Sequence, residues 1–403
     1  MITSRRQFLT AAGAVTGTAA FGAFMPAMAR AAGARDPRFV TIILRGALDG
    51  LTAVPPVGDP DYVPLRGQLA VDKAQALPLN DMFSLHPALV NLKRQYDARQ
   101  AILFHAAASP YRDRSHFDGQ DTLESGFTGP GHTDSGWLNR LLVTLPNEQR
   151  ANPRGANPQG LGIGAMTPLV IRGKAETLGW APSNLKAADA DLPPRLLSLY
   201  QAGDPMFANV LQEAITTGRI ASGYNTMNAT GGAGDPKTMV AMAEGSARLL
   251  AAADGPRVCA LAFEGWDTHA AEAQRLQTLL TGLDNAFNAF EQTLGPAWND
   301  TAILVVTEFG RTAAVNGTQG TDHGTATMAY LTGGAVKGGR VIANWPGLKP
   351  AQLYQNRDLA PTTDLRSIAK GVMMSFYDTP QSALDNDIFP DSASAAPMRD
   401  LIA

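Results

Sequence analysis

Carboxylate and imidazole side chains follow an apolar run near the middle of the chain. Residues 257–263 (RVCALAF) predict a short buried strand, and Asp267 and His269 come shortly after its end. A second imidazole, His323, stands in a Gly-rich loop further along the chain. One carboxylate with two imidazoles is a donor set that suits zinc or a similar divalent ion. The pattern therefore predicts a metal site formed by these three residues.

A second set of donors is rich in oxygen. Asp49 and Glu308 each come after another apolar run, and the hydroxyl of Ser115 can join them. Such a set suits magnesium, manganese or calcium, and two adjacent ions could hold the attacking and leaving oxygens of a displacement at phosphorus or sulfur. Ser115 is the predicted nucleophile, with a metal-activated water as the alternative. Arg311 could bind the tetrahedral anion through two hydrogen bonds.

Each of these residues also has an ordinary structural interpretation. An aspartate before a glycine, as at Asp49, is typical of a turn, and Ser115 with Asp118 fits a capping box. A helix amino terminus is also a good place to bind an anion, so capping and function are compatible. The other interpretations are a helix cap by Asp267, an ion pair between Glu308 and Arg311, and a loop hydrogen bond by His323. Because most of these residues fall at predicted strand ends, a shared metal site is favoured.

Four apolar runs predict the strands that must position these side chains: 39–44, 101–107, 257–263 and 301–307. Between the last two, residues 270–294 carry Leu and Phe at three- and four-residue steps, which predicts an amphipathic helix. The alternation of strand and helix predicts an α/β fold whose mostly parallel sheet is covered by helices on both faces. In such sheets reacting groups collect outside the carboxyl ends of the strands.

The chain is predicted to hold a single domain at 36–403, with loop-rich insertions near 59–85 and 177–234 that shape the pocket. Ahead of it, residues 1–29 predict a twin-arginine signal peptide, because paired arginines precede a small-residue apolar stretch and an A-x-A cleavage site. The protein is therefore expected to use the twin-arginine export machinery and to be periplasmic or secreted. The apolar stretch is too short and too rich in Gly and Ala for a stable membrane span.

Charge and cysteine content exclude other classes of protein. A net charge of −3 leaves no basic footprint for nucleic acid. The lone Cys259 cannot form an intramolecular disulfide, and its place in an apolar run indicates a buried small side chain. The chain has neither the C-x-x-C-H nor the G-x-G-x-x-G pattern expected of a haem or flavin redox enzyme.

Six motifs together resemble a known family. They are Arg45-Gly-Ala-Leu-Asp49-Gly-Leu, Leu85-His86-Pro87, Arg114-Ser115-His116-Phe117, Gly265-Trp-Asp-Thr-His269, Thr307-Glu-Phe-Gly-Arg-Thr312 and Asp322-His323-Gly324. This set resembles the domain of unknown function numbered fifteen hundred and one, a family made up largely of exported twin-arginine proteins. The likeness spans nearly the whole mature chain. That family in turn resembles the alkaline phosphatase and sulfatase superfamily, an α/β fold with a two-metal centre.

The resemblance implies roles for single residues. Asp49 would be the ligand after the first strand, Ser115 the nucleophile at a helix end, Asp267 and His269 the Asp and His of one metal site, Glu308 the later acidic ligand and His323 the last histidine. The chain differs from the superfamily in two places. Its Asp and His are two residues apart instead of four, and Phe309 follows Glu308 where the superfamily commonly has histidine. His116 is the candidate to supply the missing imidazole.

The combined interpretation is an exported protein of alkaline-phosphatase-like fold that hydrolyses phosphate or sulfate esters. It would use one or two divalent ions among zinc, manganese, magnesium and calcium, and its substrate would be a small-molecule or polymeric anionic ester. The alternative is a non-catalytic periplasmic or envelope protein that keeps this fold and binds a ligand, a glycan or a secretion partner, since fold does not fix function. Convergence of the named residues in one cluster would favour the hydrolase, and scatter would favour the binding protein.

Overall fold

A mixed, mostly parallel sheet forms the centre of the protein. The computed structural model describes residues 35–145, 160–182, 192–204, 207–208, 211–212, 214–217 and 232–403. Within these ranges, nine strands form the main sheet in the order β10-β4-β9-β8-β1-β7-β5-β6, with β11 pairing β4. The strands are β1 (Arg38–Leu44), β4 (Ala101–Ala108), β5 (Gly160–Ile163), β6 (Thr177–Trp180), β7 (Val258–Phe263), β8 (Thr301–Val306), β9 (Thr327–Thr332), β10 (Arg340–Ile342) and β11 (Thr363–Asp364).

The central strand β1 pairs in parallel with β7 on one side and β8 on the other. All three strands are buried along their whole length, as expected of parallel strands covered on both faces. The strand β9 runs antiparallel to both β8 and β4. The four strands that the apolar runs predict are all present, and the carboxyl ends of β1, β7 and β8 lie side by side.

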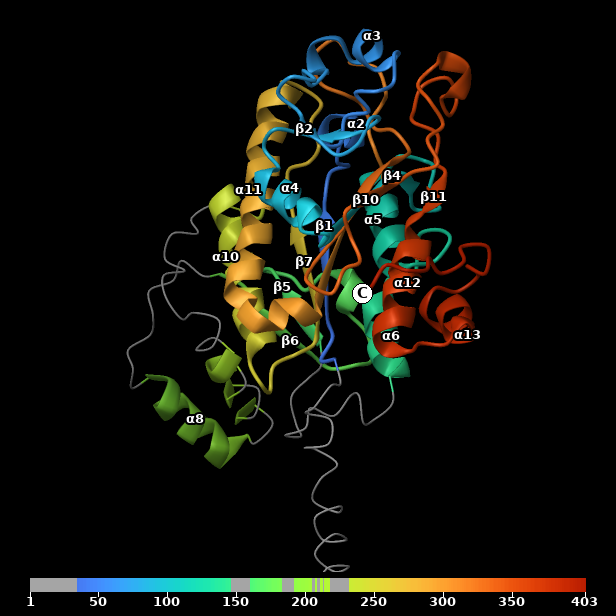
Figure 1. Ribbon diagram of the computed structural model, residues 1–403. Coiled ribbons are helices and arrows are strands. Elements are labelled where there is room, and N and C mark those ends of the chain that lie inside the picture. The colour runs from blue at the N-terminus through green and yellow to red at the C-terminus, as the bar shows by residue number, and fades with distance from the viewer. Residues whose placement is uncertain are drawn as a thin grey trace, which may run out of the picture.

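Helices cover both faces of the sheet, which confirms the predicted α/β architecture (Figure 1). One face packs against α4 (Val90–Asp97), α10 (Pro236–Ala251) and α11 (Glu272–Leu294). The other packs against α5 (His116–Ser125), α6 (Trp137–Thr144) and α12 (Leu365–Tyr377). The apolar stripe of α11 is buried against the sheet, and this long helix ends where Gly295 adopts a positive φ of 54°.

Short elements lie around this core. They are α2 (Gly50–Ala53), α3 (Tyr62–Arg66), η1 (Gly67–Leu69), β2 (Leu77–Pro78), β3 (Ser84–Leu85), η2 (Leu169–Ile171), α8 (Leu192–Gly203), η4 (Gly295–Asp300), η5 (Pro350–Gln352), α13 (Gln381–Ala383) and η6 (Leu384–Ile388). The insertion predicted near 59–85 thus contains α3 and a small hairpin of β2 and β3. It lies at the end of the sheet where β1 leads into α2 (Figure 1).

Two sequence predictions fall wholly or partly outside the described residues. The signal peptide predicted at 1–29 lies outside them, and so does much of the insertion predicted at 177–234. Within the described ranges, no helix combines the length and the apolarity that crossing a bilayer requires.

Candidate metal centre

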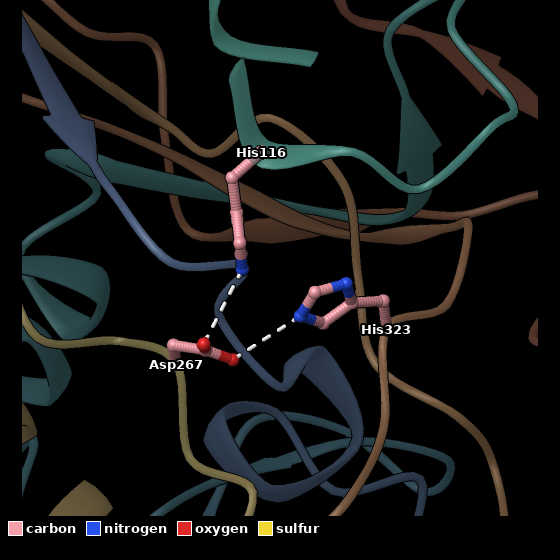
Figure 2. A group of neighbouring side chains, drawn as sticks. All are labelled: His116, Asp267 and His323. Carbon is pink, nitrogen blue, oxygen red and sulfur yellow. Dashed lines mark ion pairs between the residues drawn. The ribbon is translucent and has the colours of Figure 1, made fainter. Parts of the chain in front are cut away.

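Three side chains from distant parts of the chain converge beyond the carboxyl ends of β7 and β8. His116 begins α5, Asp267 follows β7, and His323 lies in the loop before β9. Their imidazoles and carboxylate point toward one another (Figure 2). The Nε2 atom of His116 lies 3.4 Å from Oδ2 of Asp267, and Nε2 of His323 lies 3.4 Å from Oδ1. Among the described residues, these three offer ligand atoms that all lie within 4.8 Å of one another.

His269 joins this group from the side of Asp267. Its Nε2 atom is 3.0 Å from Oδ1 of Asp267 and 3.0 Å from Nε2 of His323. Two unprotonated ring nitrogens at this distance repel each other, so the contact needs a proton or a cation between them. The structure therefore brings together Asp267, His269 and His323 with His116, the residue that the sequence offers as the source of a further imidazole.

All three histidines present the same nitrogen to the centre, because an acceptor holds the other one. Nδ1 of His116 lies 2.8 Å from Oε1 of Glu308, and Nδ1 of His269 lies 3.2 Å from Oδ1 of Asp322. Nδ1 of His323 lies 2.9 Å from the carbonyl oxygen of Arg114. A hydrogen on each Nδ1 leaves the Nε2 lone pair free, which is the arrangement of metal-binding histidines. Nε2 of His116 is buried and has no hydrogen-bond partner among the described residues.

Glu308 lies behind His116 and is fully buried. Its Oε1 accepts hydrogen bonds from the backbone N–H of Gly46 at 2.9 Å and from Gln120 at 3.1 Å, in addition to His116. Its Oε2 accepts one from the hydroxyl of Thr307 at 2.9 Å. Burial alone would raise the pKa of Glu308, but these hydrogen bonds lower it, and the bond to Glu308 raises the pKa of His116. The ionised carboxylate therefore fixes the imidazole.

Arg311 lies behind Asp267 and is also buried. One guanidinium N–H group donates to Oδ1 of Asp267 at 2.6 Å, and Nε donates to the hydroxyl of Thr321 at 3.1 Å. A third donates to the carbonyl oxygen of Thr321. Burial would raise the pKa of Asp267, but the bond and charge of Arg311 lower it. The structure thus gives Arg311 a place different from the expected one, since its donors orient Asp267 and do not face the open side of the centre.

Asp49 is buried and bonded to residues outside the group around Asp267. Its Oδ1 accepts a hydrogen bond from the N–H of Leu51 at 3.1 Å, which caps α2, and its Oδ2 accepts one from the hydroxyl of Thr52 at 2.6 Å. The guanidinium of Arg66 forms an ion pair with the same Oδ2. The described hydrogen-bond and ion-pair partners of the Asp49 side chain are thus Leu51, Thr52 and Arg66, and none of them belongs to the group around Asp267.

Ser115 precedes α5 directly and is half-buried beside His116. Its hydroxyl makes no capping hydrogen bond to the described first turn of α5, so the capping box expected with Asp118 is not formed. The backbone N–H of Ser115 donates to the hydroxyl of Tyr111 at 3.2 Å. The serine hydroxyl is therefore held at the amino end of a helix without serving as its cap.

The centre is open to solvent on one side. The side chains of Asp267 and His269 are 41% and 43% exposed, whereas those of His323 and His116 are 27% and 23% exposed. Backbone packing brings Asp267 into this position. Gly46 adopts a φ of 119°, and a Cβ atom there would collide with the backbone nitrogen of Asp267, so the turn after β1 needs glycine at this position.

Residues 98–378 match the sequence family described as Protein of unknown function (DUF1501). The chain belongs to this family. No curated protein matches the chain in sequence.

Several solved structures are similar in fold. Ps i-CgsB, solved in complex with k-i-k-neocarrahexaose, is 11% identical, with 90% of this chain and 77% of that chain covered and a TM-score of 0.44. A protein of the alkaline phosphatase superfamily from Vibrio parahaemolyticus is 12% identical over 86% of this chain and 67% of that chain, with a TM-score of 0.37. A mutant of TAB5 alkaline phosphatase with Mg bound in its M3 site is 11% identical over 77% and 94%, with a TM-score of 0.35.

Sequence reasoning named Glu308 and Arg311 with other roles, and it did not assign the remaining partners of the candidate ligands. Asp322 stands in the Asp-His-Gly motif next to a predicted ligand, and that adjacency is the signal that could have found it. The carbonyl oxygen of Arg114 carries no signal in sequence, because every residue has one. Arg66 and Glu272, which surround Asp49, also gave no pattern, since an isolated arginine and a helix-start glutamate are common on protein surfaces.

Proposed function

We propose that this member of the family is an exported, metal-dependent hydrolase of phosphate or sulfate esters. The observation that carries the proposal is the shared orientation of His116, His269 and His323. Each has its Nδ1 atom against an acceptor and its Nε2 atom facing the group around Asp267. The group lies at the solvent-exposed end of the sheet, where a substrate can reach it.

The donor set fits a zinc ion or a similar divalent ion. Zinc binds imidazole nitrogen and carboxylate oxygen at about 2 Å, so two ligands of a tetrahedral site are about 3.3 Å apart. The separations between neighbouring donor atoms here, 3.0 and 3.4 Å, lie close to that value. The buried, unpartnered Nε2 of His116 gives the same indication. A bound divalent ion that also accepts a fifth ligand would supply a Lewis acid that polarises an ester oxygen and neutralises developing charge.

The protein's own residues would hold and orient this centre. Asp267, His116, His269 and His323 are the proposed ligands. Glu308 orients His116, and Arg311 orients Asp267 instead of binding the substrate anion. In metal centres of enzymes, carboxylates and other groups behind the ligands typically orient them through hydrogen bonds.

Ser115 is the proposed nucleophile, because its hydroxyl lies at the amino end of α5 next to the ligand His116. Backbone N–H groups and the helix dipole at this end favour an anionic ester group. The serine oxygen would form a bond to phosphorus or sulfur while the ester oxygen leaves as an alcohol with the proton of the hydroxyl. Water would then release phosphate or sulfate and regenerate the serine, so that the net reaction consumes one water per ester.

The location of the protein is part of the same proposal. The twin-arginine pattern in residues 1–29 supports export of the folded chain, and the net charge of −3 gives no support for a nucleic-acid substrate. The substrate is proposed to be an anionic ester of a small molecule or a polymer in the periplasm or outside the cell.

Elemental analysis of the purified protein tests the proposal first. We expect about one divalent ion per chain in the wild type and loss of that ion in His269→Ala and His323→Ala. His132→Ala is the matched control, because His132 is an exposed histidine that stacks on Phe127 and is not among the contacts of the centre. A folded wild type that takes up no added zinc, manganese, magnesium or calcium would refute the hydrolase and favour the binding protein.

Activity is tested next with 4-nitrophenyl phosphate and 4-nitrophenyl sulfate. Ser115→Ala is expected to retain the metal and to lose at least about a hundredfold in kcat, because a nucleophile contributes to the chemical step and little to metal binding. Unchanged turnover in Ser115→Ala would show that the serine is not the nucleophile.

A further inference from the structure

A buried arginine lies at the place where the sequence motifs predict acidic ligands of a second metal ion. Arg66 ends α3, inside the insertion near 59–85, and its side chain is fully buried. Its guanidinium forms an ion pair with Asp49 and lies 3.8 Å from Oε1 of Glu272. The cation therefore comes from a loop segment over the strand ends and meets two buried carboxyl groups.

Both terminal nitrogens of Arg66 also donate to other oxygen atoms, whereas its buried Nε has no hydrogen-bond partner among the described residues. One terminal nitrogen donates to the carbonyl oxygens of Thr312 and Ala313 at 3.2 and 3.1 Å, and the other donates to the hydroxyl of Thr52 at 2.8 Å. Carboxylates, carbonyls and hydroxyls are the ligands that a hard divalent ion takes in proteins. Here one guanidinium occupies this set of oxygens.

The charges in this cluster balance without an added ion. Burial would raise the pKa of Asp49, but the charge of Arg66 lowers it, so Asp49 is ionised. Burial and the charge of Asp49 raise the pKa of Glu272 to about 9, so Glu272 is neutral near pH 7 and can donate a hydrogen bond to Asp49. One cation thus faces one anion, as a buried cluster requires.

The other acidic residue of the predicted second site is also fully engaged. Four donors bind the two oxygens of Glu308, and one of them is the N–H of Gly46, which cannot move without disturbing the turn after β1. Neither Asp49 nor Glu308 therefore presents an oxygen to a second ion.

We infer that the protein has a one-metal centre, in which the guanidinium of Arg66 occupies the position of the second cation. This inference rests on the proposed function only for the first ion, at Asp267 and its histidines. It narrows the expectation of one or two ions to one, and it gives the 59–85 insertion a definite role, which is to carry Arg66 to Asp49.

Metal stoichiometry in the full mature chain tests the inference. The protein is equilibrated with excess zinc, manganese, magnesium or calcium, freed of unbound ion, and analysed for metal per chain. We expect one ion. Two ions would overturn this inference alone, whereas a chain that binds none would overturn both this inference and the proposed function, so the two failures are distinguishable.

An isosteric variant provides a second test. Asp49→Asn keeps the shape of the side chain, and we expect it to retain one ion with a dissociation constant within about threefold of the wild type, since Asp49 is not a ligand. Loss of the ion in a folded Asp49→Asn protein would overturn the inference. His323→Ala, which removes a proposed ligand, is the positive control for loss.

The complementary variant removes the guanidinium. Arg66→Ala leaves the acidic cluster without its cation, and we expect its melting temperature to fall and to recover in part with millimolar calcium or magnesium, while the wild type does not respond. A destabilised Arg66→Ala protein that gains nothing from either ion would overturn the assignment of Arg66 to the place of a cation.

Discussion

The substitution Glu308→Gln tests whether Glu308 orients His116 or binds the metal ion directly. The substitution keeps the shape of a side chain that is fully buried and changes its charge. The glutamine oxygen can still accept from His116, Gly46 and Gln120. Its amide can donate to the hydroxyl oxygen of Thr307, whose hydrogen can turn to the carbonyl oxygen of Leu44, 2.6 Å away. The hydrogen bonds are therefore retained, and what is lost is the negative charge behind the imidazole.

The expected loss of zinc affinity is about 10- to 100-fold, the range for residues that orient a metal-binding histidine. This corresponds to about 1.4 to 2.7 kcal/mol of binding free energy. The affinity is measured by competition with a chromophoric chelator at pH 7.5. Glu124→Gln is the matched control, because Glu124 is a buried glutamate on α5, the helix that His116 begins, and it pairs with Arg45. The zinc affinity of Glu124→Gln should differ from that of the wild type by less than about threefold.

Two results would refute this reasoning. A loss below threefold in Glu308→Gln would show that the charge of Glu308 has no influence on His116. A loss as complete as that of His323→Ala would show that Glu308 is a direct ligand and that the bound form differs from the arrangement described here.

Three further predictions follow from other buried groups. Because Glu272 has a pKa of about 9 in the fold against an ordinary value of 4.5, the folded chain keeps a proton that the unfolded chain loses, so the free energy of unfolding should fall between about pH 5 and 9. Urea denaturation at a series of pH values should show the equilibrium constant of unfolding rising by at most about tenfold per pH unit in this range. In Glu272→Gln this dependence on pH should be weaker. Gly46→Ala should lose about 1–3 kcal/mol of stability and should also lose metal affinity. Gly67 has a positive φ but open space for a Cβ, so Gly67→Ala should lose stability alone. Calorimetry measures the stability of both variants, and zinc titration measures their metal affinity. Lys370→Met should lose about 3–5 kcal/mol of stability in urea denaturation, because Asp385, 2.6 Å from the ammonium, loses its partner. The double variant Lys370→Met with Asp385→Leu should recover part of this loss. Unchanged stability in Lys370→Met would contradict the pairing.

The fold could be predicted to a large extent because its central strands are apolar throughout. β1, β7 and β8 are buried on both faces, and a continuous apolar run is the pattern of such strands. Pairing could not be predicted in the same way. The run at 101–107 forms β4, which pairs in parallel with β10 and antiparallel with β9, and nothing in an apolar run specifies the direction of its neighbours.

The candidate metal centre could be predicted in part for a related reason. Asp267 follows a strand that is easy to recognise, and His269 and His323 are among the six histidines of the chain, so residue type and position together limit the choice. His116 lacks this support because it begins a helix after a loop. Only the motif Arg-Ser-His-Phe, taken with the resemblance, indicated it.

Asp49 and Glu308 show that a position at the end of a strand does not by itself determine the role of a carboxylate. A carboxylate at the carboxyl end of a parallel strand is well placed to bind a metal. Its role depends on which cation or hydrogen-bond donor packs against it in the folded chain. Arg66 reaches Asp49 from a segment with no regular pattern, and His116 and Gln120 reach Glu308 from a helix almost two hundred residues away in sequence. Because a buried carboxylate must be neutralised or bonded by something, the sequence predicts the need for a partner, and only the packing of distant segments decides whether that partner is a metal ion, a guanidinium or an imidazole.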